Sequence, residues 1–172
     1  MDLARSYVWH TFKTADRTLG DFTETIVQIL LRNGLLQQDF TVLFEKDKLR
    51  NVYFTGLLAI GVVDLRNSVR PRTAVLIGER LQPLLQFPSG IASRSTAGLV
   101  SEYLREVEAK AAEMPAHEAI ALHMMGLLGL GHGEHARRLS RNPLCVTALS
   151  RQLLAVGTGW WNAAVEDVRI AA

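Results

Sequence analysis

Two stretches of the chain, Val52–Val63 and Ile120–Gly131, are almost entirely apolar, and the second carries His123 as its only polar side chain. A helix without a polar face is buried either at the centre of a globular protein or in lipid. Twelve helical residues extend over only about 18 Å, whereas the hydrocarbon core of a bilayer is about 30 Å thick. The two stretches therefore predict central helices of a globular domain and not permanent membrane spans.

Both apolar stretches contain glycines, among them Gly56, Gly61, Gly126 and Gly129. A glycine inside a helix costs roughly 1 kcal/mol relative to alanine, so these positions need a reason. Three reasons are open. The glycines allow close packing against a neighbouring helix in a soluble core, they form a small-residue face for helix association in lipid, or the chain becomes an irregular glycine loop after Gly129.

The N-terminal part of the chain predicts two helices. Asp2 can cap the first, which Gly20 ends, and Asp21 begins a second that stops at Asn33-Gly34. The expected apolar stripe of the first helix consists of Ala4, Val8, Phe12, Ala15 and Leu19.

The rest of the chain predicts further helices separated by turns. The longest turn-rich segment is Phe87–Thr96, which we expect to be a mobile loop. The clearest amphipathic pattern belongs to Leu99–Met114. The expected helices after Gly34 are Phe40–Glu45 (where a strand is the alternative), the apolar helix from Asp47 to Val63, Thr73–Leu85 with Pro83 inside it, Leu99–Met114, a helix from Pro115 through the second apolar stretch, a helix from Pro143 to Gly157, and Trp160–Ile170.

We therefore expect an all-α protein, a single compact domain over residues 1–172 with about eight or nine short helices and the apolar helices at its centre. Apolar residues make up 48% of the chain and charged residues 21%, which are ordinary values for a globular protein. The sequence MDLARSYVWHTFK has no basic segment followed by an apolar run, so we expect synthesis in the cytoplasm without a signal peptide.

No arrangement of residues predicts a catalytic site, a metal site or a cofactor. The single cysteine, Cys145, is expected to be a small buried side chain. An enzyme would depend on His132, Glu134 and His135, but no nucleophile elbow, P-loop or dinucleotide fingerprint accompanies them. The net charge is only +2 and aromatic residues do not alternate with basic ones, which argues against a nucleic-acid partner.

Several features favour action on a membrane. The indole of Trp160 or Trp161 can anchor at a bilayer interface, and the basic segments Arg66–Arg72 and Arg137–Arg141 flank the apolar stretches. This layout is similar to that of bacterial pore-forming toxin domains of the colicin sort, which hide apolar helices inside a helical globule. The resemblance implies a membrane-active toxin or effector that is soluble when made, is exported, inserts into a lipid bilayer and has an immunity or chaperone protein as a partner. The membrane-insertion candidates are Gly56, Gly61, Gly126, Gly129, Trp160 and Trp161.

The alternative is a helical protein-interaction module without catalysis, such as an adaptor, a chaperone or an inhibitor. Met114, Met124 and Met125 could line a groove for a partner helix, because methionine side chains adapt to irregular surfaces. The two functions differ in their partner, which is a lipid bilayer for the first and a protein for the second.

Overall fold

The computed structural model describes residues 3–32, 46–91, 94–130 and 143–157. These residues confirm the all-α class, since their only β feature is an isolated bridge between Pro88 and Ser95. They form six α-helices and one short π-helical segment, fewer than the eight or nine helices expected. The expected helices Phe40–Glu45 and Trp160–Ile170 lie outside the described residues. The elements are α1 (Leu3–Arg32), α3 (Lys46–Ser68), α4 (Pro71–Leu84), α5 (Thr96–Ala109), α6 (Ala116–Met125), η1 (Gly126–Leu130) and α8 (Pro143–Gly157).

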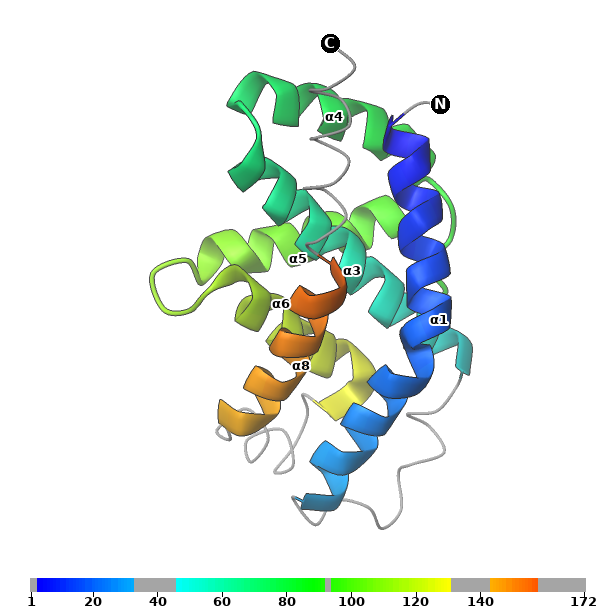
Figure 1. Cartoon of the computed structure of the whole chain (residues 1–172), viewed down its shortest axis with the longest axis vertical. Coiled ribbons are helices and arrows are strands. Elements are labelled where there is room, and N and C mark those ends of the chain that lie inside the picture. Colours follow the sequence, from blue (N-terminus) through cyan, green and yellow to red (C-terminus); the bar gives the residue numbers. More distant parts are fainter. Residues whose placement is uncertain (1–2, 33–45, 92–93, 131–142, 158–172) are drawn as a thin grey trace.

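Helix α3 is the centre of the protein, as its apolar pattern predicted. Every residue from Val52 to Gly61 is buried, and α3 packs against α1, α5, α6 and α8. Figure 1 shows α3 passing through the middle of the molecule, next to α1 on one side. Within the described ranges, no helix is both long enough and apolar enough to cross a membrane.

Helix α1 is continuous over 30 residues, so the predicted break at Gly20 is wrong. Gly20 is exposed, and a Cβ on it would meet no atom within 4 Å. Leu19, Phe22 and Ile26 on both sides of it are buried, and burial of a large apolar side chain contributes about 1.5–3 kcal/mol. That gain exceeds the cost of about 1 kcal/mol for a helical glycine. Packing therefore carries the helix through Gly20, and the two predicted helices become one.

The face that α1 turns to the core also differs from the predicted stripe. Tyr7, Thr11 and Thr14 are buried, whereas Val8 is half-buried and Phe12 is exposed. The predicted members Ala4, Ala15 and Leu19 are buried as expected. The core-facing side of α1 is therefore rotated toward its threonines and away from Phe12.

Polar contacts between α1 and α3 stabilise this rotation. The Tyr7 hydroxyl donates to the Leu58 carbonyl oxygen at 3.0 Å, and the hydroxyl oxygens of Thr18 and Tyr53 lie 2.9 Å apart. The rings of Phe22 and Tyr53 stack with centroids 4.1 Å apart. Buried polar groups need hydrogen-bond partners, and in this orientation α3 supplies them to Tyr7 and Thr18.

Gly126 and Gly129, the described glycines of the second apolar stretch, do not lie in a close helix–helix contact. Gly126 has ordinary helical angles, with φ −59° and ψ −46°, whereas Gly129 has φ +79° in the left-handed region. A Cβ on either residue would meet no atom within 4 Å. Gly129 interrupts the regular helix within η1, and most of the segment where the glycine loop was predicted, after Leu130, lies outside the described residues.

The remaining elements follow their local signals. The Ser95 side chain accepts a hydrogen bond from the Gly98 amide at 3.0 Å and starts α5 three residues before the predicted Leu99. Pro83 is accommodated in the last turn of α4, and α8 ends at Gly157 as predicted.

Candidate functional site

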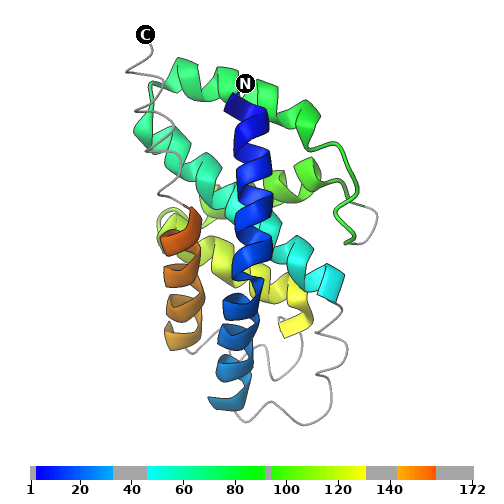
Figure 2. The same ribbon diagram turned by 45° about the vertical axis from the view of Figure 1, so that its right-hand side comes forward.

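An open groove lies on the surface where α1, α3 and α4 meet. Its volume is about 330 Å³, and its walls come from the N-terminal half of α1, from α3, from the last turn of α4 and from the loop after α4. Figures 1 and 2 show α4 crossing near the N-terminal end of α1, which brings these segments together. The lining residues are Arg5, Val8, Trp9, Phe12, Phe54, Leu84 and Phe87.

Four aromatic rings form a row along this groove. The Trp9 and Phe12 rings stack with centroids 6.3 Å apart, and Phe12 meets Phe54 edge-on at 5.8 Å. The Phe54 ring in turn lies 6.5 Å from the Phe87 ring. Phe54 is the buried member of this row, and the other three rings are partly exposed to solvent, Trp9 at 57%, Phe12 at 39% and Phe87 at 41%. The groove thus has a solid apolar base and exposed aromatic walls.

The rotation of α1 keeps these aromatic side chains at the surface. Thr11 and Thr14 are buried in the core, while their neighbours Trp9 and Phe12 face the groove. Large aromatic side chains gain more than threonine from burial, and the hydrogen bonds of α1 to α3 offset that loss. The exposed rings are therefore apolar surface that the described part of the fold leaves in water.

Two cations of α1, Arg5 and Lys13, give the groove a basic rim on its α1 side. Arg5 lines it, and the Lys13 Nζ lies 4.8 Å from the centroid of the Trp9 ring, a cation–π contact. The pKa of His10 is lowered, first by partial burial and then by the charges of Arg17 and Lys13. A bound segment would therefore meet an apolar floor with a basic rim.

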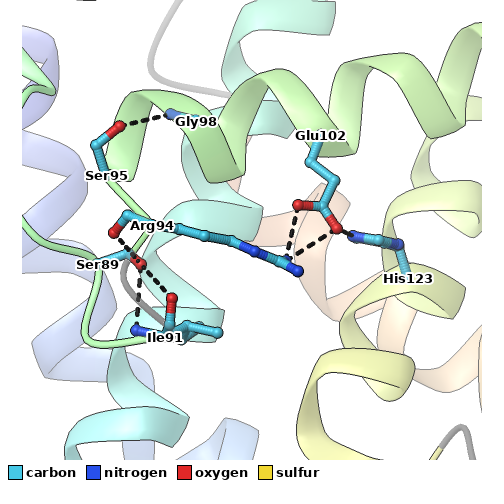
Figure 3. A network of polar contacts seen from close by, with 7 residues as sticks. All are labelled: Ser89, Ile91, Arg94, Ser95, Gly98, Glu102 and His123. Atoms are coloured by element: carbon cyan, nitrogen blue, oxygen red, sulfur yellow. Dashed lines mark hydrogen bonds and ion pairs between the residues drawn. The ribbon is translucent and has the colours of Figure 1, made fainter.

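A polar cluster formed by Arg94, Glu102 and His123 lies on another part of the surface (Figure 3). The Arg94 Nη1 donates to both carboxylate oxygens of Glu102, at 3.0 and 2.8 Å, and the His123 Nε2 lies 3.1 Å from Glu102 Oε1. The His123 ring also meets the buried Tyr103 ring edge-on, with centroids 5.1 Å apart. Because two cationic or potentially cationic groups already occupy the Glu102 carboxylate, it is poorly placed to act as a general base.

The polar cluster is connected to the groove through the loop between α4 and α5. Ser89, buried in this loop, donates to the Arg94 carbonyl oxygen at 2.8 Å and accepts from the Ile91 amide at 3.2 Å. The Thr96 amide donates to the Phe87 carbonyl oxygen at 2.8 Å. These bonds and the Arg94–Glu102 pair fix the loop on α5, and the loop carries the Phe87 wall of the groove.

The described membrane-insertion candidates lie on two elements that pack against each other, α3 and η1. Gly56 and Gly61 are buried in α3, and Gly126 and Gly129 belong to η1. Trp160 and Trp161 lie outside the described residues, as do His132, Glu134 and His135. Met124 and Met125 are buried in the core and Met114 is half-buried, so Met124 and Met125 cannot line a groove for a partner helix as predicted. In the described part of the chain, no group of three His, Cys, Asp or Glu side chains could hold a metal ion.

The aromatic groove was not predicted, because the apolar pattern of α1 assigned Phe12 to the core stripe. The available signal was the pair Trp9 and Phe12, three residues apart on one helix face, with Arg5 and Lys13 one turn before and one turn after Trp9. The contributions of Phe54 and Phe87 come from distant segments, and no local pattern points to them.

No protein family model, no curated protein and no solved structure matches this chain. The function must therefore be argued from the groove itself.

Proposed function

We propose that this protein is a helical interaction module, and that it binds an apolar segment of a partner protein in the groove between α1, α3 and α4. The observation that supports this proposal is the row of exposed aromatic rings, Trp9, Phe12 and Phe87, over the buried Phe54. Aromatic residues are enriched at the centres of protein interfaces, where a few of them supply most of the binding free energy.

The openness of the groove favours a protein segment over a small molecule. A drug-sized ligand usually has about 70–90% of its surface buried in its pocket. Roughly half of Trp9 and of Phe87 is exposed to solvent on the walls of this groove, so these walls do not enclose such a ligand. A segment of a partner protein would lie along the aromatic row and cover it.

The membrane-active function expected from the sequence is a weaker proposal. Gly56 and Gly61 lie in a helix whose apolar residues form the core of the fold. The feature that fits a membrane surface is Trp9 with the cations Arg5 and Lys13 beside it, since indoles and cations bind at anionic bilayer interfaces. The test of the proposal therefore includes vesicles.

A displayed library of random peptides, each about 15 residues or longer so that helices can form, tests the proposal. The full chain is the bait, and selected peptides are synthesised and titrated against the chain and its variants by fluorescence polarisation. We expect peptides whose affinity falls at least about tenfold in Trp9→Ala or Phe87→Ala. Leu76→Ala is the matched control, because Leu76 is 60% exposed on α4 and lies outside the groove.

Two results would overturn the proposal. One is the absence of any selected peptide that is sensitive to Trp9→Ala. The other is that the chain binds anionic vesicles or makes them leak, that Trp9→Ala abolishes this effect, and that no peptide depends on the groove. The second result would support action on a membrane instead of binding to a partner protein.

A further inference from the structure

We infer that the segment bound in the groove is an amphipathic helix that carries two acidic side chains seven or eight residues apart, one facing Arg5 and the other Lys13. This inference rests on the proposed function and specifies the partner of the same groove. It follows from the spacing of the cations, the form of the groove and the distribution of charge around it.

The spacing of the two cations matches a helical repeat. The Cα atoms of Arg5 and Lys13 are eight residues apart on α1, about 12 Å along the helix axis, and the Lys13 ammonium, which rests over the Trp9 ring, would turn from that ring to reach a partner. Residues seven or eight apart on a second helix lie on one face and span about 11–12 Å. Acidic groups at that spacing, with large apolar residues between them, would meet both cations while the apolar residues fill the aromatic row.

The fold also favours a helix over an extended peptide. An extended peptide that binds by strand addition needs the exposed edge of a sheet. The described residues contain no sheet, whereas their groove runs beside the exposed face of α1. A helix laid in an apolar groove suits this surface, and a polyproline segment, which also docks on aromatic-lined grooves, would tolerate the proline that a helix does not.

The N-terminal half of α1 is positively charged, and its acidic residue does not neutralise the two cations at the groove. Between Leu3 and Arg17 the only acidic residue is Asp16, and it is paired with Arg50 of α3. Neither Arg5 nor Lys13 forms an ion pair with another described residue. Complementary charge on the partner would raise the association rate and fix the register of the helix in the groove.

The same charges argue against a second copy of this chain as the occupant. In a two-fold symmetric contact, groove against groove, the basic rim of one copy meets the basic rim of the other. Arg5 and Lys13 of both copies would then be close to like charges, which is unfavourable in a partly desolvated interface. A partner with an acidic helix has no such conflict.

The peptides selected in the library provide the test. We expect the groove-dependent peptides to share acidic residues seven or eight apart with apolar residues between them. The double variant Arg5→Glu with Lys13→Glu should bind them at least about tenfold more weakly. The control is Arg105→Glu with Arg151→Glu, which makes the same change in net charge on α5 and α8, at exposed residues outside the groove.

Two further measurements check the helical form and the charge contribution. A proline placed in the middle of a selected peptide should abolish binding, because it breaks a helix. Raising the ionic strength from about 0.05 M to about 0.5 M should weaken binding to the native chain more than binding to the charge-reversed chain, since salt screens the exposed charges.

The outcomes separate this inference from the proposed function. Peptides that depend on Trp9 but lack the acidic spacing, or that bind the charge-reversed chain unchanged, would overturn the inference and leave the interaction module standing. Peptides that tolerate a central proline would overturn the helical form. If no peptide depends on Trp9, or if only anionic vesicles bind in a charge-dependent way, both proposals fail.

Discussion

The terminal methyl group of Met124 in α6 lies at the place that a Cβ on Gly56 of α3 would occupy. Both residues are buried. The Met124 methyl group can occupy this place only because residue 56 has no Cβ. One glycine of the first apolar stretch is thus explained by packing in the core of the fold.

The contact between Gly56 and Met124 predicts a large difference between two similar substitutions. Gly56→Val should lower the free energy of unfolding by about 3 kcal/mol, because the added methyl groups have to displace Met124 in a packed core. Gly126→Val should change it by less than about 1 kcal/mol, since Gly126 is helical and has open space around it. Urea unfolding followed by circular dichroism measures both. Equal effects of the two substitutions would show that α3 and α6 do not approach closely at Gly56.

The loop that carries Phe87 should depend on Ser89. Ser89→Ala removes a buried hydroxyl that bonds the Arg94 carbonyl oxygen and the Ile91 amide. Leaving a buried polar group without its partner costs about 1–3 kcal/mol, so we expect a loss of that size in urea unfolding. Amide hydrogen exchange at Thr96, whose amide bonds the Phe87 carbonyl oxygen, should become faster. Unchanged exchange at Thr96 would show that the hydrogen bonds of Ser89 do not hold the Phe87 wall of the groove in place.

Alkaline pH should destabilise the fold through Tyr103. Burial raises the pKa of the Tyr103 hydroxyl above its ordinary value near 10, although a hydrogen bond with Thr55 opposes the shift. The folded chain therefore keeps this proton where the unfolded chain loses it. The contribution of Tyr103 is fully present below about pH 10 and is lost as the pH rises from there toward the folded pKa.

Urea unfolding at several pH values on both sides of about 10 checks the effect of Tyr103. We expect Tyr103→Phe to flatten the alkaline loss, because phenylalanine cannot ionise. Burial also raises the pKa of Tyr53, so some alkaline loss should remain in this variant. A pH profile identical to that of the native chain would exclude Tyr103 as a cause.

The aromatic walls of the groove should contribute little to folding. Trp9→Ser and Phe87→Ser should each lower the free energy of unfolding by less than about 1.5 kcal/mol, because roughly half of each side chain is already in water. Both variants should reduce the fluorescence of bis-ANS, a dye that binds exposed apolar surface, and Leu76→Ser should reduce it less. A loss of several kcal/mol in Trp9→Ser would assign Trp9 to the core and weaken the proposed function.

Local signals in the sequence determined the helical class and much of the helix placement. The all-round apolar pattern of Val52–Val63 predicted the buried central helix α3, because a helix without a polar face has to be covered. Pro143 and Gly157 bound α8 as predicted, since the conformational preferences of proline and glycine act on their own neighbourhood.

Only the tertiary structure decided how α1 is oriented and where the candidate site lies. Gly20 was a sound local signal for a helix end, but burial of Leu19 and Phe22 on α3 outweighed it. The apolar pattern of α1 allowed either Phe12 or Thr11 to face inward, and the hydrogen bonds of Tyr7 and Thr18 to α3 selected Thr11. Such a choice depends on partners at least 35 residues away, which no local periodicity contains.

The groove and the polar cluster are both formed by residues that are distant in the sequence and meet only in the tertiary structure. Phe54 and Phe87 join Trp9 and Phe12 only when α3 and the loop after α4 pack beside α1. Arg94, Glu102 and His123 likewise come from a loop and two helices. The sequence by itself determined which segments become helices, because helix formation depends on neighbouring residues. The surface that these helices present was decided by packing, because each helix buries the face for which the rest of the fold provides apolar contacts and hydrogen bonds.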